Sequence, residues 1–253
     1  AILLDRVGVI PVGLDLHSYR VMLSSPLLLR SYYNSVLYAV TGTSLGLLLS
    51  VMTAYPLCIP GMKAKIPFTL LMAFTMFFGG GLIPTFLVVR GLGLLDTIGA
   101  IIIPGAISVF NVIILRTNFQ RLPSSLRETA QLDGANHLLI AFFVYVQLSK
   151  AILATLFLFD VVSYWNQFFA PLIYLRSPEK LPLQVILRDI IITEGEVPGA
   201  RIDYMPDDTR LVPEYRESLQ NTAIVLSVVP MLIVYPFVQR YFVKGTLVGA
   251  LKG

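Results

Sequence analysis

The sequence has few of the residues that build metal centres and nucleophilic active sites. Its 253 residues include one cysteine, Cys58, and two histidines, His17 and His137, which are far apart in the chain. One cysteine cannot form an intrachain disulfide or a thiolate metal cluster, and two isolated histidines do not make a zinc site. We therefore expect no catalytic residue, no metal site and no cofactor bound by this chain itself.

A nucleotide-binding loop is also missing. The pattern G-x-x-x-x-G-K-[ST], whose backbone amides and lysine hold phosphates, occurs nowhere in the 253 residues. Any ATP-driven work by this protein therefore requires partner subunits that bind ATP and its Mg²⁺.

Charged residues are scarce as well, at 13% of the chain, whereas soluble domains have about 25%. Hydrophobic residues make up 56%, and the mean hydropathy is +0.76. This composition predicts an all-α, polytopic membrane helix bundle in contact with the lipid bilayer. The pI is near 9.2, but Lys and Arg are scattered through loops, which indicates membrane topology and not nucleic-acid binding.

Five apolar segments are long enough to cross a bilayer, which needs about 20 residues of helix. We place them at residues 31–59, 66–89, 95–115, 151–175 and 219–238. Asp96 is in position to cap the third segment. Residues 1–30 are of mixed composition and predict an aqueous segment with short helices, while residues 31–253 form one transmembrane domain.

A polar, helix-forming insert covers residues 124–150. Ser125 and Glu128 have the spacing of a capping box, which predicts the start of a short helix. An Asp-Gly pair ending at Gly134 predicts its end, because glycine adopts the left-handed conformation that terminates helices. A second helix is predicted over residues 135–145. This helix, turn and helix outside the lipid are typical of an element that contacts a soluble partner.

The insert contains a spaced motif. It begins with Glu128-Thr129-Ala130; three residues later comes Gly134, and nine residues after that comes Val144-Tyr145-Val146. This arrangement resembles the EAA loop of permease subunits of ABC importers. The family pattern is E-A-A, three residues, G, nine residues and I-x-L-P.

Three positions depart from that pattern. Thr129 replaces an alanine, which is a mild change. Gln147 and Ala151 stand where prolines are common in the family, so these departures concern the bend into the next membrane segment and not the turn at Gly134.

Further stretches resemble the carbohydrate-uptake branch of this family, in the order expected for it. They are Asn34-Ser35-Val36-Leu37, Ala54-Tyr55-Pro56-Leu57, Gly79-Gly80-Gly81-Leu82-Ile83-Pro84-Thr85, Trp165-Asn166 and residues 235–242. The resemblance covers nearly the whole chain. It is strongest to permeases for oligosaccharides released from polysaccharides, including acidic ones such as pectin and alginate fragments. It implies the type I ABC importer fold in the bacterial cytoplasmic (inner) membrane.

The resemblance also implies a topology. The family usually has six crossings with both ends in the cytoplasm, so we expect one crossing before this sequence and a periplasmic segment at residues 1–30. A cytoplasmic coupling loop is expected at residues 117–150 and a periplasmic loop at residues 176–218. The charges barely decide the orientation, because nine of the 19 Lys and Arg residues lie in the segments expected inside.

The partners implied are a second, related permease subunit forming a heterodimer, two ATPase subunits that bind ATP and Mg²⁺, and a periplasmic or tethered solute-binding protein. Each ATPase would receive one coupling loop, and its closure would move the attached membrane helices. The residues expected to couple are Glu128, Ala130, Leu132, Asp133, Gly134 and Ala135. Without the resemblance, the same spacing fits a solvated loop whose glycine only caps a helix.

Polar and aromatic residues gather in the fourth apolar segment, where Asp160 is an acid at membrane depth. Asp160, Ser163, Tyr164 and Gln167 have helical spacing and predict one helix face. Because sugars are bound by polar groups together with an aromatic ring, we expect a solute pathway here, formed by Asp160, Ser163, Tyr164, Trp165, Asn166 and Gln167. Bonds to neighbouring helices and an interfacial role for the tryptophan are the alternatives. Weaker candidates are Asn34, Tyr55 and Asn111.

Two features elsewhere allow two interpretations each. Gly79-Gly80-Gly81 and Pro84 interrupt the second segment, which favours either close helix packing or a bend at a gate. The loop at residues 176–218 fits a surface for the solute-binding protein or a lid of short helices over the pore.

Other function classes fit less well. A membrane-embedded enzyme needs a nucleophile and base or a set of metal ligands, which the chain does not supply. An ion-driven secondary solute transporter remains the alternative, although it would not need the polar insert.

Overall fold

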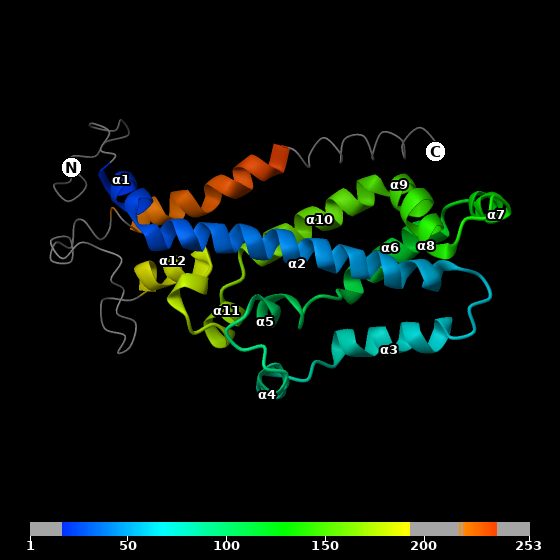
Figure 1. Ribbon diagram of the computed structural model, residues 1–253, viewed down its shortest axis with the longest axis horizontal. Coiled ribbons are helices and arrows are strands. Elements are labelled where there is room, and N and C mark those ends of the chain that lie inside the picture. Colours follow the sequence, from blue (N-terminus) through cyan, green and yellow to red (C-terminus); the bar gives the residue numbers. More distant parts are fainter. Residues whose placement is uncertain (1–16, 193–217, 219, 237–253) are drawn as a thin grey trace. The chain divides into compact units, whose positions relative to one another are not determined.

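The computed structural model describes residues 17–192, 218 and 220–236, and every regular element in these residues is a helix (Figure 1). The predicted all-α class is therefore confirmed for the part described. The chain divides into two compact units, Ala1–Val36 with Gln167–Leu232 and Leu37–Asn166 with Ile233–Gly253. Predictions that concern residues 1–16, 193–217, 219 and 237–253 lie outside the described residues.

The first unit begins with a short helix and the start of a long one. Pro26 opens the long helix, because its fixed φ and missing N–H suit the first helical turn. The long helix thus begins inside residues 1–30, which the sequence predicted to contain short helices. The elements of this unit are α1 (His17–Ser24), the first part of α2 (Pro26–Cys58), α11 (Phe169–Tyr174), the 3₁₀ turn η3 (Pro178–Lys180), α12 (Leu183–Ile192) and most of an apolar helix, Gln220–Pro236.

The second unit contains the rest of α2 and the helices that follow it, up to α10. Figure 1 shows them in chain order from blue to green. They are α3 (Lys65–Phe77), α4 (Leu82–Gly91), α5 (Ile98–Ile102), α6 (Val109–Gln120), α7 (Ser124–Leu132), α8 (His137–Leu139), the π-helix η2 (Ile140–Tyr145), α9 (Val146–Leu148) and α10 (Lys150–Trp165).

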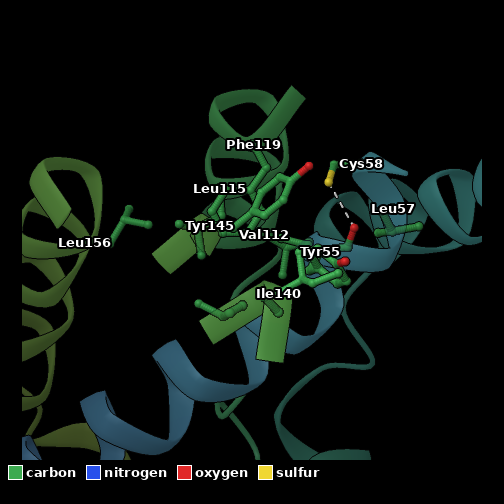
Figure 2. Close-up of a cluster of buried hydrophobic side chains, with 12 residues drawn as sticks. Tyr55, Leu57, Cys58, Val112, Leu115, Phe119, Ile140, Tyr145 and Leu156 are labelled. Atoms are coloured by element: carbon green, nitrogen blue, oxygen red, sulfur yellow. Dashed lines mark hydrogen bonds between the residues drawn. The ribbon is translucent and has the colours of Figure 1, made fainter. Parts of the chain in front are cut away.

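The core of the second unit lies where the C-terminal part of α2 meets α6 and η2 (Figure 2). Leu115, Ile140 and Leu156 are among its fully buried side chains. The polar insert is thus attached to the membrane helices through an apolar core, because residues of η2 are part of that core.

The second predicted crossing, residues 66–89, is not one helix. It consists of α3 and α4, which are bent by 113° at the break between them. The three glycines favour a break because each costs about 1 kcal/mol in a helix relative to alanine. A Cβ added to Gly79 or Gly80 would meet nothing within 4 Å, so within this chain the glycines serve the bend and not close packing.

The third predicted crossing, residues 95–115, is also divided. It contains α5 and α6, with Pro104 and Gly105 in the connection between them. The prediction that Asp96 caps a helix is wrong: Thr97 occupies the N-cap of α5, and Asp96 has a positive φ of 58°. Ser108 does cap α6, because its side chain accepts a hydrogen bond from the amide of Asn111.

The fourth predicted crossing, residues 151–175, is divided, because α10 ends at Trp165 and α11 follows it. Within the described residues, the fifth contains the helix Gln220–Pro236. α2 is the one described helix that is long and apolar enough to cross a membrane by itself. Two bent pairs, α3 with α4 and residues 137–148 with α10, raise the number to three if each pair is one span.

Candidate functional site

Most residues of helix α7 are exposed to solvent. None of its residues is buried, and Leu132 at its end is 89% exposed. Leu126, Leu138 and Leu139 around the turn are exposed too. The polar insert thus exposes four leucine side chains, and apolar groups of this kind are often covered by partner proteins.

The turn after α7 is held by backbone hydrogen bonds. The amide of Gly134 donates to Gln131 O at 3.0 Å, and the amide of Ala135 donates to Ala130 O at 2.9 Å. This is the Schellman arrangement, with Gly134 at φ +81°. The predicted helix stop is therefore confirmed. A Cβ at Gly134 would meet nothing within 4 Å, so the turn requires glycine for its φ and not for space.

The predicted capping box at the start of α7 is wrong. The N-cap is Pro123, with ψ 131°, and no side chain accepts a capping bond. Because the helix starts at Ser124, Ser125 lies inside the first turn and its hydroxyl is not at the N-cap position.

The predicted second helix of the insert is present and has an unusual form. Asn136 caps it, because its Oδ1 accepts a hydrogen bond from the amide of Leu139 at 2.9 Å. The helix continues as the π-helix η2 and then as α9. It bends by 87° into α10 near Ser149, so the bend forms although Gln147 and Ala151 replace the usual prolines.

The six predicted coupling residues differ in their surroundings. Ala130 and Ala135 pack, partly buried, against the core of the second unit. The side chain of Glu128 is 60% exposed and forms a surface ion pair with Arg127 at 3.8 Å. Glu128, Leu132, Asp133 and Gly134 are exposed. The two alanines thus fix the turn, and the exposed residues are available to a partner.

Asp160 is joined to a neighbouring helix. Nδ2 of Asn111 donates to both carboxylate oxygens of Asp160, at 3.0 and 2.8 Å. Asn111 is 2% exposed, and the bond connects α6 with α10. This contact matches the interhelical alternative for Asp160, because a charged group at membrane depth needs a polar partner.

Tyr164 lies against a glycine of α2. A Cβ added to Gly42 would be 2.4 Å from Cζ of Tyr164, so the ring occupies the space that a side chain would need. Gly46, one turn further along α2, would bring a Cβ to 3.3 Å from Ala106 O. Gly42 and Gly46 were not predicted as site residues, although their G-x-x-x-G spacing is a known signal for close helix approach.

The other predicted pathway residues are not all on one face. Ser163 and Asn166 are exposed, whereas Trp165 is 3% exposed and therefore not a surface anchor. α10 ends at Trp165, so the prediction that Gln167 continues the same helix face is wrong. Helical spacing predicted that face, but the chain turns at Asn166 before the residue is reached.

The two remaining candidates also bind within the protein. Nδ2 of Asn34 donates to Glu179 O at 2.7 Å and to Leu181 O at 3.1 Å, which holds the chain that enters α12. The hydroxyl of Tyr55 lies 3.3 Å from Nδ1 of His137. Neither side chain is directed at open space.

Comparisons with known proteins agree with these features. The chain is 41% identical over 244 residues to the polygalacturonan/rhamnogalacturonan transport system permease protein YtcP of Bacillus subtilis (strain 168), covering 96% of this chain and 84% of the relative. It is 39% identical to protein LplC of the same organism, over 97% of this chain and 81% of LplC. No protein-family model matches the chain.

A solved structure is similar in fold. It belongs to a bacterial ABC transporter involved in the import of the acidic polysaccharide alginate. Its TM-score is 0.83 at 36% sequence identity, over 96% of this chain and 85% of that chain. The chain also has an exposed helix, turn and helix at the position of the EAA loop. On these similarities, the chain belongs to the permease proteins of ABC transporters for sugar import.

Proposed function

We propose that this chain is the permease subunit of an ATP-driven importer and forms half of the translocation pathway for an oligosaccharide. The observation that carries the proposal is the solvent-facing turn between α7 and α8, held by two backbone hydrogen bonds, in a chain of this family. ATP and Mg²⁺ are bound by partner ATPase subunits, and this chain itself is not catalytic.

The exposed side of the turn is the part that docks on an ATPase. Leu132 offers an apolar contact, and Glu128 and Asp133 offer negative charge for basic residues. Ala130 and Ala135 hold the turn on the core, so a displacement of the tip is passed to the membrane helices and not absorbed by the loop.

The solute is an acidic oligosaccharide. The relatives named for polygalacturonan and rhamnogalacturonan and the solved alginate importer support this class. Ser163 and Asn166, which are exposed, are the polar groups best placed to contact the solute.

The membrane topology is five crossings in this sequence and six in the family fold. We assign the five to α2, the bent pair α3 and α4, the segment with α5 and α6, the segment that begins with α10, and Gln220–Pro236. The location is the bacterial cytoplasmic membrane. The loop that contains η3 and α12 then faces the periplasm, where a solute-binding protein or the pore entrance lies.

A second, related permease chain completes the pathway. Helix α3 has no buried residue, and Ile66, Leu70 and Phe77 are among its exposed side chains. A helix that is apolar and unburied within its own chain is covered by lipid or by another membrane subunit. The ion-driven transporter is set aside, because it explains neither the turn nor the family.

The experiment that tests the docking role is purification of the chain from its native membrane with its bound partners, before and after Gly134→Trp. We expect an ATPase and a second permease to co-purify, and the ATPase to be lost in the variant. The matched control is Gly93→Trp, since Gly93 also has a positive φ and open space for a Cβ. Equal loss of the ATPase in both variants, or no ATPase with the wild type, contradicts the proposal.

Transport itself is tested in vesicles with a radiolabelled oligogalacturonate. We expect uptake that requires ATP and persists when an ionophore collapses the proton and sodium gradients. Uptake that stops with the ionophore and needs no ATP would restore the secondary transporter.

A further inference from the structure

Tyr55 is a buried residue near the C-terminal end of α2, at 4% exposure. Its hydroxyl oxygen lies 3.3 Å from Nδ1 of His137, and the two ring centroids are 6.2 Å apart. His137 is the first residue of α8, three positions after Gly134. A membrane-helix side chain therefore contacts the insert directly behind the turn.

Tyr55 also contacts the far end of the same segment. The ring of Tyr145, the last residue of η2, meets the ring of Tyr55 edge to face, with centroids 5.1 Å apart at 80°. Tyr145 in turn meets Phe119 of α6 at 5.4 Å and 83°. Figure 2 shows Tyr55, Tyr145 and Phe119 in one cluster. Tyr55 thus holds both ends of residues 137–145.

The segment between these two contacts is a π-helix. Such helices are rare; they appear mostly as single turns inside α-helices, and frequently at functional sites. Ile140, Ala141 and Tyr145 within it are buried. A π turn contains one residue more than the α turn it replaces. A change between the two forms therefore moves the residues N-terminal to η2, while the residues C-terminal to it keep their packing.

The two contacts of Tyr55 differ in strength. Tyr145 and Phe119 are buried, so separating their rings would leave a gap in the core. His137 is exposed, so its imidazole can move away from the Tyr55 hydroxyl without creating a cavity. Water then takes the place of the imidazole as hydrogen-bond partner. The contact at His137 therefore opens first, while the contact at Tyr145 keeps the segment attached.

Pro56 makes α2 less rigid next to Tyr55. Proline has no N–H, so the carbonyl one turn earlier in α2 lacks its helical hydrogen bond. A displacement applied at Tyr55 therefore acts beside a point where α2 lacks one backbone hydrogen bond.

We propose that Tyr55 and His137 form a latch that transmits the movement of the α7–α8 turn to the membrane helix α2. Both are positioning residues, because they act through the two elements that they join. The inference rests on the proposed function, since it concerns how docking at the turn reaches the pathway. When the latch is closed, the turn and α2 move together; when it is open, a smaller part of the turn's movement reaches α2.

The test compares the purified complexes of the wild type, Tyr55→Phe, His137→Leu and His137→Asn. The phenylalanine keeps the ring against Tyr145 and removes only the hydroxyl. The asparagine places its side-chain amide close to the position of Nδ1 and is the rescue variant. The matched control is Tyr33→Phe, because Tyr33 is an exposed tyrosine of the same helix.

We measure hydrogen exchange over residues 137–145, co-purification of the ATPase, and the ATP hydrolysed per oligogalacturonate imported. Tyr55→Phe and His137→Leu should raise the exchange about two- to tenfold, the range expected for loss of one hydrogen bond. They should raise the ATP used per solute about fivefold, with ATPase binding unchanged. His137→Asn and Tyr33→Phe should behave like the wild type.

The outcomes separate the latch from the proposed function. Loss of the ATPase in Tyr55→Phe overturns the latch, because the residue would then only shape the docking surface. Unchanged exchange, or unchanged ATP use with raised exchange, also overturns it. If the wild type co-purifies with no ATPase and imports no solute, the proposed function fails and the latch fails with it. If the wild type transports and Tyr55→Phe uses the same amount of ATP per solute, the latch alone fails.

Discussion

Asn111 and Asp160 are joined through a single amide nitrogen, which donates to both oxygens of the carboxylate. The two residues are 49 positions apart and belong to α6 and α10. The arrangement gives the acid a neutral partner, so Asp160 needs no nearby cation to remain in the apolar part of the chain.

Asn111→Leu should lower the stability of the protein by about 2 kcal/mol, because it leaves the carboxylate of Asp160 without its donor. Asp160→Asn should change stability by less than about 1 kcal/mol, since two amides still form a hydrogen bond. Thermal unfolding in detergent measures both. If Asp160→Asn abolished uptake while stability and assembly stayed intact, the carboxylate would act in transport and not only in helix pairing.

Gly42→Ala should destabilise the protein by about 1–2 kcal/mol, because its Cβ would overlap the ring of Tyr164. The cost is moderate because the overlapping atom is at the far end of a side chain that can swing away. Tyr164→Ala in the same chain should remove most of this cost. Gly91→Ala is the control, since it is helical, has open space and should be neutral or slightly stabilising. Equal effects at the two glycines would contradict close packing at Gly42.

Gly134→Ala should weaken the turn by about 1–2 kcal/mol through its positive φ alone, because no atom obstructs the added Cβ. Gly134→Asn should cost less, since asparagine tolerates the left-handed region. Stability and co-purification of the ATPase should both follow the order Gly, Asn, Ala. If asparagine were the worse of the two, the position would be limited by contact with a partner and not by backbone conformation.

Asn34→Leu should loosen the entry to α12, because the carbonyls of Glu179 and Leu181 lose their donor. The cost is about 1–3 kcal/mol, typical of buried groups left without a hydrogen bond. Faster hydrogen exchange over residues 178–187 checks the prediction. Ser35→Ala should also raise exchange in this segment, since Ser35 Oγ accepts a hydrogen bond from the amide of Leu183 at 2.8 Å. Unchanged exchange in both variants would show that the segment is held by its apolar packing.

Local chemistry explains what could be predicted from the sequence. The end of α7 at Gly134 depends on one glycine, and the break between α3 and α4 on three glycines, so short patterns were sufficient. The start of α7 was mispredicted because Pro123 competed with the serine two positions later. The cap at Asp96 was mispredicted because the next residue, Thr97, took that position.

Long-range contacts explain what could not be predicted. Asp160 was recognised as unusual, but its partner Asn111 lies on another helix, and no spacing rule connects them. The same is true of Gly42 with Tyr164 and of Tyr55 with His137. A helical wheel placed Gln167 beside Asp160, whereas the helix ends before it. The contacts of these side chains depend on tertiary packing, which sequence periodicity does not describe.

The Schellman turn after α7 has a consequence for how such a protein changes over generations. Its hydrogen bonds join main-chain atoms of Gln131 and Gly134 and of Ala130 and Ala135, and they use no side-chain atom. Side chains such as Leu132 and Asp133 can therefore be exchanged while the backbone keeps its path. A permease can in this way acquire a new ATPase partner by altering the exterior of the tip, with one glycine retained as the fixed requirement.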